Sequence, residues 1–259
     1  MSLFSFFNKK VNSNDYEESI YKQVNVKPLK KNIRLLVISD THGDLALSKT
    51  LKNDIIDKEF DLCCVLGDIH DYDYRLILDY IPKDKIVALL GNHDRFDLLK
   101  TYDLKDLNGK VVEVNGVKIG GIQGSFKYKD QEFPSFTHEQ SIEFMEKMPY
   151  VDILLSHDKP FTYDYKDGAH DGLKGITMFL YDRQVPINIH GHLHTSDLKT
   201  LKNGTQVKGV YEVELLDIKD GKVEIVRWKK LMLTVKRWFI SIALKGHIQE
   251  FSIACIYSD

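Results

Sequence analysis

The stretch LLVISDTHGD (residues 35–44) begins as an uninterrupted apolar run and then turns abruptly polar at Asp40 and His42. A short apolar run of this kind is typical of a strand that is buried on both faces, as the strands of parallel sheets are. In α/β sheets, ligands bind at the carboxyl ends of strands, because the loops that follow can converge there. The stretch therefore predicts a parallel strand that delivers a carboxylate and an imidazole to a site.

Two further segments repeat this pattern. DLCCVLGD (residues 61–68) and KIVALLGN (residues 85–92) are short apolar runs, and segments with helical spacing separate the three runs. Their alternation predicts βαβ units and a mainly parallel core. Cys63 and Cys64 lie inside such a run, so we interpret them as strand packing. Three cysteines cannot form a disulfide framework and indicate a reducing compartment.

The second half of the chain predicts another sheet. KVVEVNGVKIGGIQGS (residues 110–125) contains two strand-like stretches joined by Asn115-Gly116, a strong hairpin signal. Helices are expected at about 137–147 and 171–183, and strands at 151–157, 185–194, 205–218 and 221–228, with turns at 203–204 and 220–221. The predicted fold is a four-layer α/β/β/α sandwich of two mixed β-sheets flanked by helices.

The termini differ from this core. We divide the chain into a lead-in segment (residues 1–31), one domain (32–229) and an apolar C-terminal extension (230–259). Lys236 and Arg237 lie at the centre of the extension and argue against a membrane-spanning helix. The extension is a terminal element docked on the domain, a surface for self-association or a membrane-surface anchor. The start of the chain lacks the features of a signal peptide.

Composition excludes several classes of protein. The 259 residues are 43% hydrophobic and 29% charged, and the formal net charge is −2. A charge so close to balance does not predict stable binding to nucleic acid or anionic lipid by bulk electrostatics. No apolar run is long enough for a transmembrane segment. We expect a cytoplasmic protein.

Metal-competent side chains follow five of the predicted strands. They are Asp40, His42, Asp68, Asn92, His157, His192 and His194. Each residue alone is better explained as a helix cap, a turn or a hydrogen-bonded structural residue, but these explanations would have to hold for all seven at once. Imidazole, carboxylate and amide donors without a thiolate suit Mn²⁺, Fe²⁺ or Zn²⁺ better than Ca²⁺. Because seven donors exceed what one ion takes, we expect two divalent transition metal ions, Mn²⁺ first, with Fe²⁺, Zn²⁺ and Ni²⁺ as alternatives.

The motifs DTH, GD, GNHD, SH and GHLH, in this order, resemble the five blocks of the calcineurin-like metallophosphoesterases. The resemblance covers about residues 33–227. It implies that Asp40, His42, Asp68 and His194 hold one metal, that Asp68, Asn92, His157 and His192 hold the other, and that Asp68 bridges them. It further implies hydrolysis of a phosphodiester or phosphomonoester by a hydroxide that bridges the two metal ions.

The same resemblance assigns two catalytic residues. His93 is similar to the family's general acid, which protonates the leaving group, and Asp71 is similar to the aspartate that orients this histidine and favours its protonated form. The protein phosphatase branch continues with Arg-Gly where this chain has Tyr72 and Asp73. The arginine that clamps the substrate phosphate is therefore missing, and Arg75 or Arg95 is its expected substitute.

The substrate is the least determined property. A small-molecule phosphate ester, such as a nucleotide, is favoured, because the chain has no broad basic surface. The alternatives are a nuclease-type phosphodiesterase and a non-catalytic scaffold of the same fold. The roles of three other histidines are undecided. His70 faces either solvent or the site, and His190 is either a core residue or part of the site. His170 begins a segment that resembles the His-x-Gly segment before a helix in small phosphodiesterases.

Overall fold

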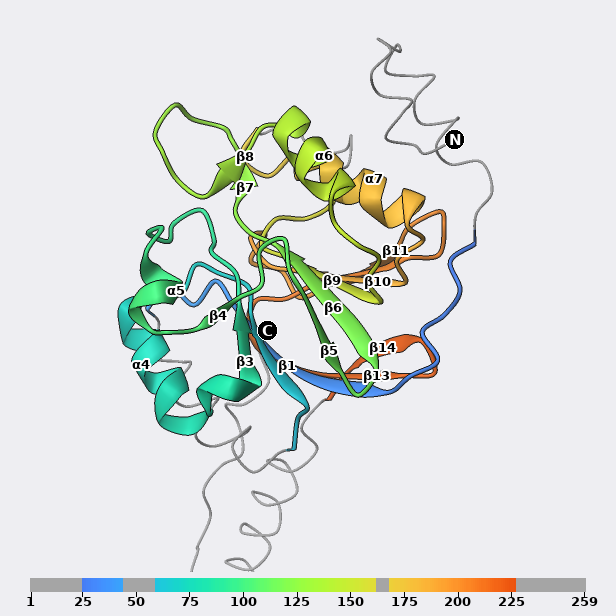
Figure 1. The fold of residues 1–259 in the computed structure, drawn as a ribbon, viewed down its shortest axis with the longest axis horizontal. Helices are drawn as coiled ribbons and strands as arrows, with labels where there is room; N and C mark the ends of the chain where they lie inside the picture. The colour runs from blue at the N-terminus through green and yellow to red at the C-terminus, as the bar shows by residue number, and fades with distance from the viewer. Residues whose placement is uncertain (1–24, 44–58, 162–167, 227–259) are drawn as a thin grey trace, which may run out of the picture. The chain divides into compact units, whose positions relative to one another are not determined.

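The computed structural model describes residues 25–43, 59–161 and 168–226 and shows two β-sheets between helices (Figure 1). Most of the lead-in segment, the expected helical segment after the first strand and the C-terminal extension lie outside these residues. No helix in the described part of the chain is long and apolar enough to cross a membrane.

The first sheet has six strands in the order β14-β13-β1-β2-β3-β4. Four of them run parallel, namely β1 (Ile33–Ser39), β2 (Leu62–Val65), β3 (Ile86–Ala88) and β4 (Lys105–Asp106). The other two, β13 (Glu212–Lys219) and β14 (Lys222–Ile225), are antiparallel to their neighbours. The sheet is therefore mixed, with the predicted parallel run at its centre.

The second sheet has six strands in the order β11-β12-β10-β9-β6-β5. Its central strands β12 (Gln206–Gly209), β10 (Ile187–His190), β9 (Ile153–Ser156) and β6 (Val117–Ile122) are parallel. The edge strands β11 (Leu198–Thr200) and β5 (Val111–Val114) are antiparallel. Asn115 and Gly116 join β5 to β6 with φ of 51° and 76°, so the predicted hairpin is confirmed.

Alternate residues of β1 face two different cores. Leu35 and Val37 belong to the core between the sheets. Leu36 and Ile38 belong to a second core with Tyr74 of α4 (Asp71–Tyr80). All four side chains are fully buried, which explains why the strand shows no polar alternation.

The remaining helices complete the layers. On the outer face of the second sheet, α6 (His138–Glu146) and α7 (Lys174–Asp182) pack over Leu154. A 3₁₀ turn, η2 (Lys83–Lys85), and the short helix α5 (Leu98–Thr101) lie on the side of the first sheet. The four-layer sandwich predicted from the sequence is confirmed, and so are both predicted helices.

The prediction of one strand over residues 205–218 is wrong. The segment forms two strands in different sheets, because β12 pairs with β10 whereas β13 pairs with β1. The chain crosses between the sheets at Val210 and Tyr211, and Glu212 begins β13 with a φ of 59°. Apolar residues occur on both sides of the crossing, so the periodicity of the sequence does not indicate that one strand ends and another begins there. The short strands β4, β11, β7 (Ser125–Phe126) and β8 (Ser135–Phe136) were also not predicted.

The carboxyl ends of the parallel strands are level with one another. In the first sheet, Ile38 pairs with Val65 and Val65 pairs with Ala88. In the second sheet, Ser156 pairs with both Ile122 and His190. The loops that follow these strands therefore leave both sheets at the same edge, which is where the candidate site lies.

A buried ion pair joins the sheets near this edge. Lys208 of β12 is fully buried, and its Nζ lies 2.8 Å from Oε2 of Glu214 on β13. The ammonium also donates to the carbonyl oxygen of Gly209 and, at 3.2 Å, to Oγ of Ser196. Ser196 in turn donates to the same glutamate. The network thus connects the two sheets to the loop after His194.

Replacing Lys208 by Met should lower the free energy of unfolding by about 3–5 kcal/mol, because Glu214 is left buried without its partner. The double variant K208M/E214L should recover much of this loss, since both charges are then removed. Urea denaturation of the single and double variants measures the difference. K147M removes one charge of the exposed pair between Lys147 and Glu143 and should change stability little. Equal stability of K208M and K147M would contradict the prediction.

Candidate metal centre

Asp40 lies at the join between the two sheets. It follows β1 directly and is 1% exposed. One carboxylate oxygen, Oδ2, accepts from Oγ of Ser39 and, at 2.8 Å, from the backbone N–H of His192 in the other sheet's loop. The other oxygen, Oδ1, is buried and has no hydrogen-bond partner among the described residues. A buried carboxylate oxygen without a donor is costly, and a cation would satisfy it.

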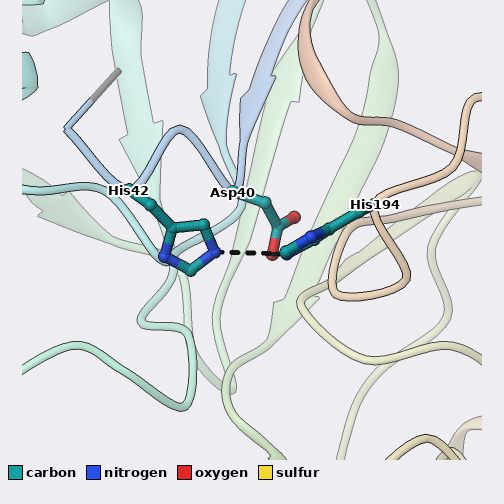
Figure 2. A group of neighbouring side chains, drawn as sticks. All are labelled: Asp40, His42 and His194. Atoms are coloured by element: carbon teal, nitrogen blue, oxygen red, sulfur yellow. Dashed lines mark hydrogen bonds and ion pairs between the residues drawn. The ribbon is translucent and has the colours of Figure 1, made fainter.

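Two imidazoles flank this oxygen. The Nε2 atoms of His42 and His194 are 3.1 Å apart, and Oδ1 of Asp40 is 3.6 Å from Nε2 of His194 (Figure 2). Asp40, His42 and His194 can each direct one atom at a common point, with these atoms within 4.8 Å of one another. Both imidazoles are exposed on their outer side. The arrangement is therefore a metal-competent group that opens to solvent.

A second group lies deeper and contains Asp40, Asp68 and His157. Oδ2 of Asp68 is 3.6 Å from Nε2 of His157 and 4.0 Å from Nε2 of His42. The same oxygen therefore faces both groups. Oδ1 of Asn92 lies 2.8 Å from Nε2 of His157, which brings the amide oxygen into the second group.

Backbone carbonyls orient the two histidines of the second sheet. Nδ1 of His157 lies 2.9 Å from the carbonyl oxygen of Leu66, which leaves Nε2 for the site. Nε2 of His192 lies 3.0 Å from the carbonyl oxygen of Ala169, so Nδ1 is its remaining nitrogen. The rings of His157 and His192 are 5.1 Å apart. The structure thus brings all seven predicted donors together, while their role as ligands stays a prediction.

The site has the electrostatics of a cation site. Burial by itself would lower the pKa of His157, but the carboxylates of Asp68 and Asp40 outweigh it, and the pKa is raised. For His192, burial prevails and lowers the pKa. Asp40 and Asp68 are both buried, and in the described ranges neither is paired with a lysine or arginine, so they leave a negative charge that divalent ions would neutralise.

Backbone strain is concentrated in the donors. Five of the seven have φ in the left-handed region, which non-glycine residues seldom adopt: Asp40 (54°), His42 (49°), Asp68 (54°), His192 (67°) and His194 (50°). Such conformations persist only where the surrounding structure enforces them, and they cluster at functional sites.

At two glycines of the motifs, neighbouring atoms lie too close to the backbone for any side chain to fit. A Cβ on Gly191 would lie 1.9 Å from Oγ of Ser39 and 2.4 Å from Oδ2 of Asp40. A Cβ on Gly91 would lie 2.1 Å from Oδ1 of Asp68. In both cases a carboxylate of the site occupies the space that a side chain would need.

Two buried aspartates that support the site were missed by the sequence reasoning. Asp94 accepts from the backbone N–H groups of Gly91 (2.7 Å), Asp68 (2.9 Å) and Ile69 (3.2 Å), and so holds the loops after β2 and β3 together. Burial raises its pKa to about 7, and the charge of Asp68 adds to this effect. The final Asp of GNHD was visible in the sequence, but its acceptor role was not.

Asp73 performs the same task for the first loop. Its Oδ2 accepts from Oγ1 of Thr41 at 2.5 Å and from the backbone N–H of Gly43 at 2.8 Å, so it holds His42 from both sides. The side chain is fully buried in the first turn of α4. Asp73 stands at the second of the two positions where the sequence departs from the phosphatase branch, next to Tyr72.

The expected catalytic residues line one cleft of about 220 Å³. His93 is exposed there, and its backbone N–H donates to Oδ1 of Asp68 at 2.8 Å. Asp71 lines the same cleft, but it accepts from Arg95 (2.5 Å) and from the hydroxyl of Tyr102 (2.8 Å), and not from His93. Arg95 therefore reaches the site, whereas Arg75 is on the exposed side of α4.

The other three histidines have separate environments. His70 caps α4 by accepting from the N–H of Tyr72 at 3.4 Å, and it lines the cleft. His190 is buried, and burial lowers its pKa to about 4, as expected for a core histidine. The ring of His170 lies 5.0 Å from that of His192, at the border of the site.

Comparisons with known proteins identify the family and the fold. The sequence model for calcineurin-like phosphoesterases matches residues 33–196. The chain is similar to the solved structure of TT1561 of Thermus thermophilus, with a TM-score of 0.55 and 16% identity over 75% of this chain and 98% of that chain. It is also similar to a dimetal phosphatase from Danio rerio, with a TM-score of 0.50 and 12% identity over 77% of this chain and 98% of that chain. At these identities the similarity shows the fold. No curated protein matches the sequence significantly.

Replacing Asp94 by Asn should lower the free energy of unfolding by about 2–4 kcal/mol, because the new amide presents donors to backbone N–H groups that need an acceptor. Urea denaturation measures the loss. Asp97→Asn is the matched control, since Asp97 lies three residues away, is exposed and bonds only at the surface. A loss no greater than that of the control would contradict the clamping role of Asp94.

Adding Mn²⁺ should stabilise the protein. At about 100 times its dissociation constant, a ligand adds about 2.7 kcal/mol, which corresponds to a rise in Tm of about 5–10 °C for a domain of this size. Differential scanning calorimetry with Mn²⁺ and with a chelator measures the shift. Asp68→Asn should lose most of it. If the Tm of the wild-type protein does not change with Mn²⁺, Fe²⁺, Zn²⁺ or Ni²⁺, the proposed metal centre is excluded.

Proposed function

Because the chain belongs to the calcineurin-like phosphoesterase family, we propose that it hydrolyses phosphate esters with two divalent metal ions held at the shared edge of its sheets. One observation carries the proposal. Two metal-competent groups meet at buried carboxylates, with Asp40 common to both and Oδ2 of Asp68 within 4.0 Å of a histidine of each. Paired groups that share a carboxylate are the arrangement that two-metal hydrolases use.

The donors divide into two sets. Asp40, His42, Asp68 and His194 would hold one ion, and Asp68, Asn92, His157 and His192 the other, with Asp68 between them. Mn²⁺ is the first candidate, because the donors are imidazoles, carboxylates and one amide oxygen, without a thiolate. When bound, two such ions lower the pKa of a water held between them and neutralise charge on the phosphate oxygens.

The leaving group must be protonated by the chain itself. His93 suits this role because it is exposed in the cleft beside the metal groups but is not one of the donors. Its backbone bond to Asp68 fixes its position relative to that carboxylate. Hydrogen bonds from Tyr102 and Arg95 lower the pKa of Asp71, which lines the same cleft as His93.

The proposed substrate is a small phosphomonoester or phosphodiester, with nucleotides to be tried first. The cleft is small, with a volume of about 220 Å³. The size of the cleft supports a small molecule over a long nucleic acid.

His93→Ala should lower kcat for an alkyl phosphate ester by about 10²–10⁴-fold in Mn²⁺, because the alkoxide then leaves without a proton. The loss should be much smaller with bis-p-nitrophenyl phosphate, since p-nitrophenolate leaves without protonation. Steady-state kinetics and metal analysis of the same samples measure both. His93→Ala should retain its metal.

Asp68→Asn is the control that separates the two roles, because it should lose metal together with activity. Equal activity of His93→Ala and wild type on the alkyl ester would remove His93 as the general acid. A wild-type protein that holds two metal ions and hydrolyses no member of a phosphate-ester panel would refute the proposed function.

A further inference from the structure

The chain lacks the arginine that would clamp the substrate phosphate, and Arg95 is largely engaged by carboxylates. Its Nη1 lies 2.5 Å from Asp71 and its Nε lies 2.9 Å from Asp97. The phosphoryl oxygens would therefore need another donor near the metal groups. The loop between β7 and β8, residues 127–134, supplies candidates there.

Tyr128 on this loop contacts a proposed metal ligand. Nδ2 of Asn92 donates to the hydroxyl oxygen of Tyr128 at 3.5 Å, while Oδ1 of Asn92 faces His157. This orientation of the amide makes the tyrosine oxygen an acceptor. Its own proton is then free, and no residue in the described ranges accepts it. Tyr128 is 36% exposed.

The loop is held firmly in relation to the metal groups. The backbone N–H of Phe126 donates to Oδ2 of Asp158 at 2.9 Å, and Asp158 directly follows His157 and is fully buried. The N–H of Gly124 donates to the carbonyl oxygen of Leu90 at 2.7 Å, two residues before Asn92. Parallel pairing of β7 with β8 closes the loop. Tyr128 is thus positioned by the same strand ends that carry Asn92 and His157.

A positive charge lies over the ring of Tyr128. Nζ of Lys129 lies 5.2 Å from the ring centre of Tyr128 and 4.8 Å from that of Phe133. The two rings pack against each other with centres 5.2 Å apart, and Phe133 is buried. The aromatic pair therefore supports the ammonium through its rings. The hydroxyl of Tyr128 contacts Asn92, and the next residue of the loop supplies a cation.

We propose that Tyr128 and Lys129 form the binding site for the non-bridging oxygens of the substrate phosphate, in place of the missing arginine. This inference rests on the proposed function and names two substrate-binding residues for it. The tyrosine donates a hydrogen bond to one oxygen, and the lysine contributes a point charge to the dianion. Neither residue is a donor to the metal groups, so metal binding should not depend on them.

The test measures binding and turnover separately. Isothermal titration of the Mn²⁺-loaded protein with inorganic phosphate should show that Tyr128→Phe raises Kd by about 10-fold, because a hydrogen bond to a charged group is lost. Lys129→Met should raise Kd by about 3-fold at low salt and less at high salt, as expected for a half-buried charge that salt still screens. KM for the ester should rise in parallel, with metal content unchanged.

Two matched controls accompany the variants. Tyr150→Phe removes a hydroxyl from a 44%-exposed tyrosine that donates to Asp152, and Lys147→Met removes a surface ammonium paired with Glu143. Both should match wild type. If Tyr128→Phe and Lys129→Met bind phosphate as wild type does, or if wild type binds none, the inference is wrong. If phosphate binding shifts as expected but no ester is hydrolysed, the binding site stands and the proposed function fails.

Discussion

The hydrogen bond between the backbone N–H of His192 and Oδ2 of Asp40 connects the two sheets at the edge where the donors meet. A second link, from Nδ1 of His157 to the carbonyl oxygen of Leu66, crosses the same gap. Each proposed ion would need donors from both sheets, so the site exists only while these links keep the sheets in place. The apolar core between the sheets provides the driving force for packing, but it is non-directional and does not set the distances.

The close contact at this edge explains why the motifs combine glycine with strained donors. A carboxylate occupies the space beside Gly191 and beside Gly91, so the chain can pass only without a side chain. Five donors then turn sharply toward the centre with left-handed φ, namely Asp40, His42, Asp68, His192 and His194. The strain is held by Asp94 and Asp73, whose carboxylates bind the N–H groups of the same loops. Local instability at the site is thus offset by buried hydrogen bonds just behind it.

Sequence reasoning predicted the parts of the structure that depend on local patterns. The apolar run of β1, the hairpin at Asn115 and the order of the donors predicted the sheets and the edge at which the donors meet. It did not predict the crossing at Tyr211, because apolar residues continue through it, nor the roles of Asp94 and Tyr128, because their partners are backbone groups or side chains distant in sequence. Side chains that act through such contacts carry no periodic signal.

The pair formed by Lys208 and Glu214 has a consequence for how the chain finds its native arrangement. Two apolar sheet faces can slide over each other by a residue pair and still bury similar area. A misaligned sandwich would, however, enclose an ammonium in one sheet and a carboxylate in the other without contact, which costs several kcal/mol. The ion pair therefore favours the one alignment of the two sheets in which Lys208 meets Glu214, and it does so near the edge where the donors meet.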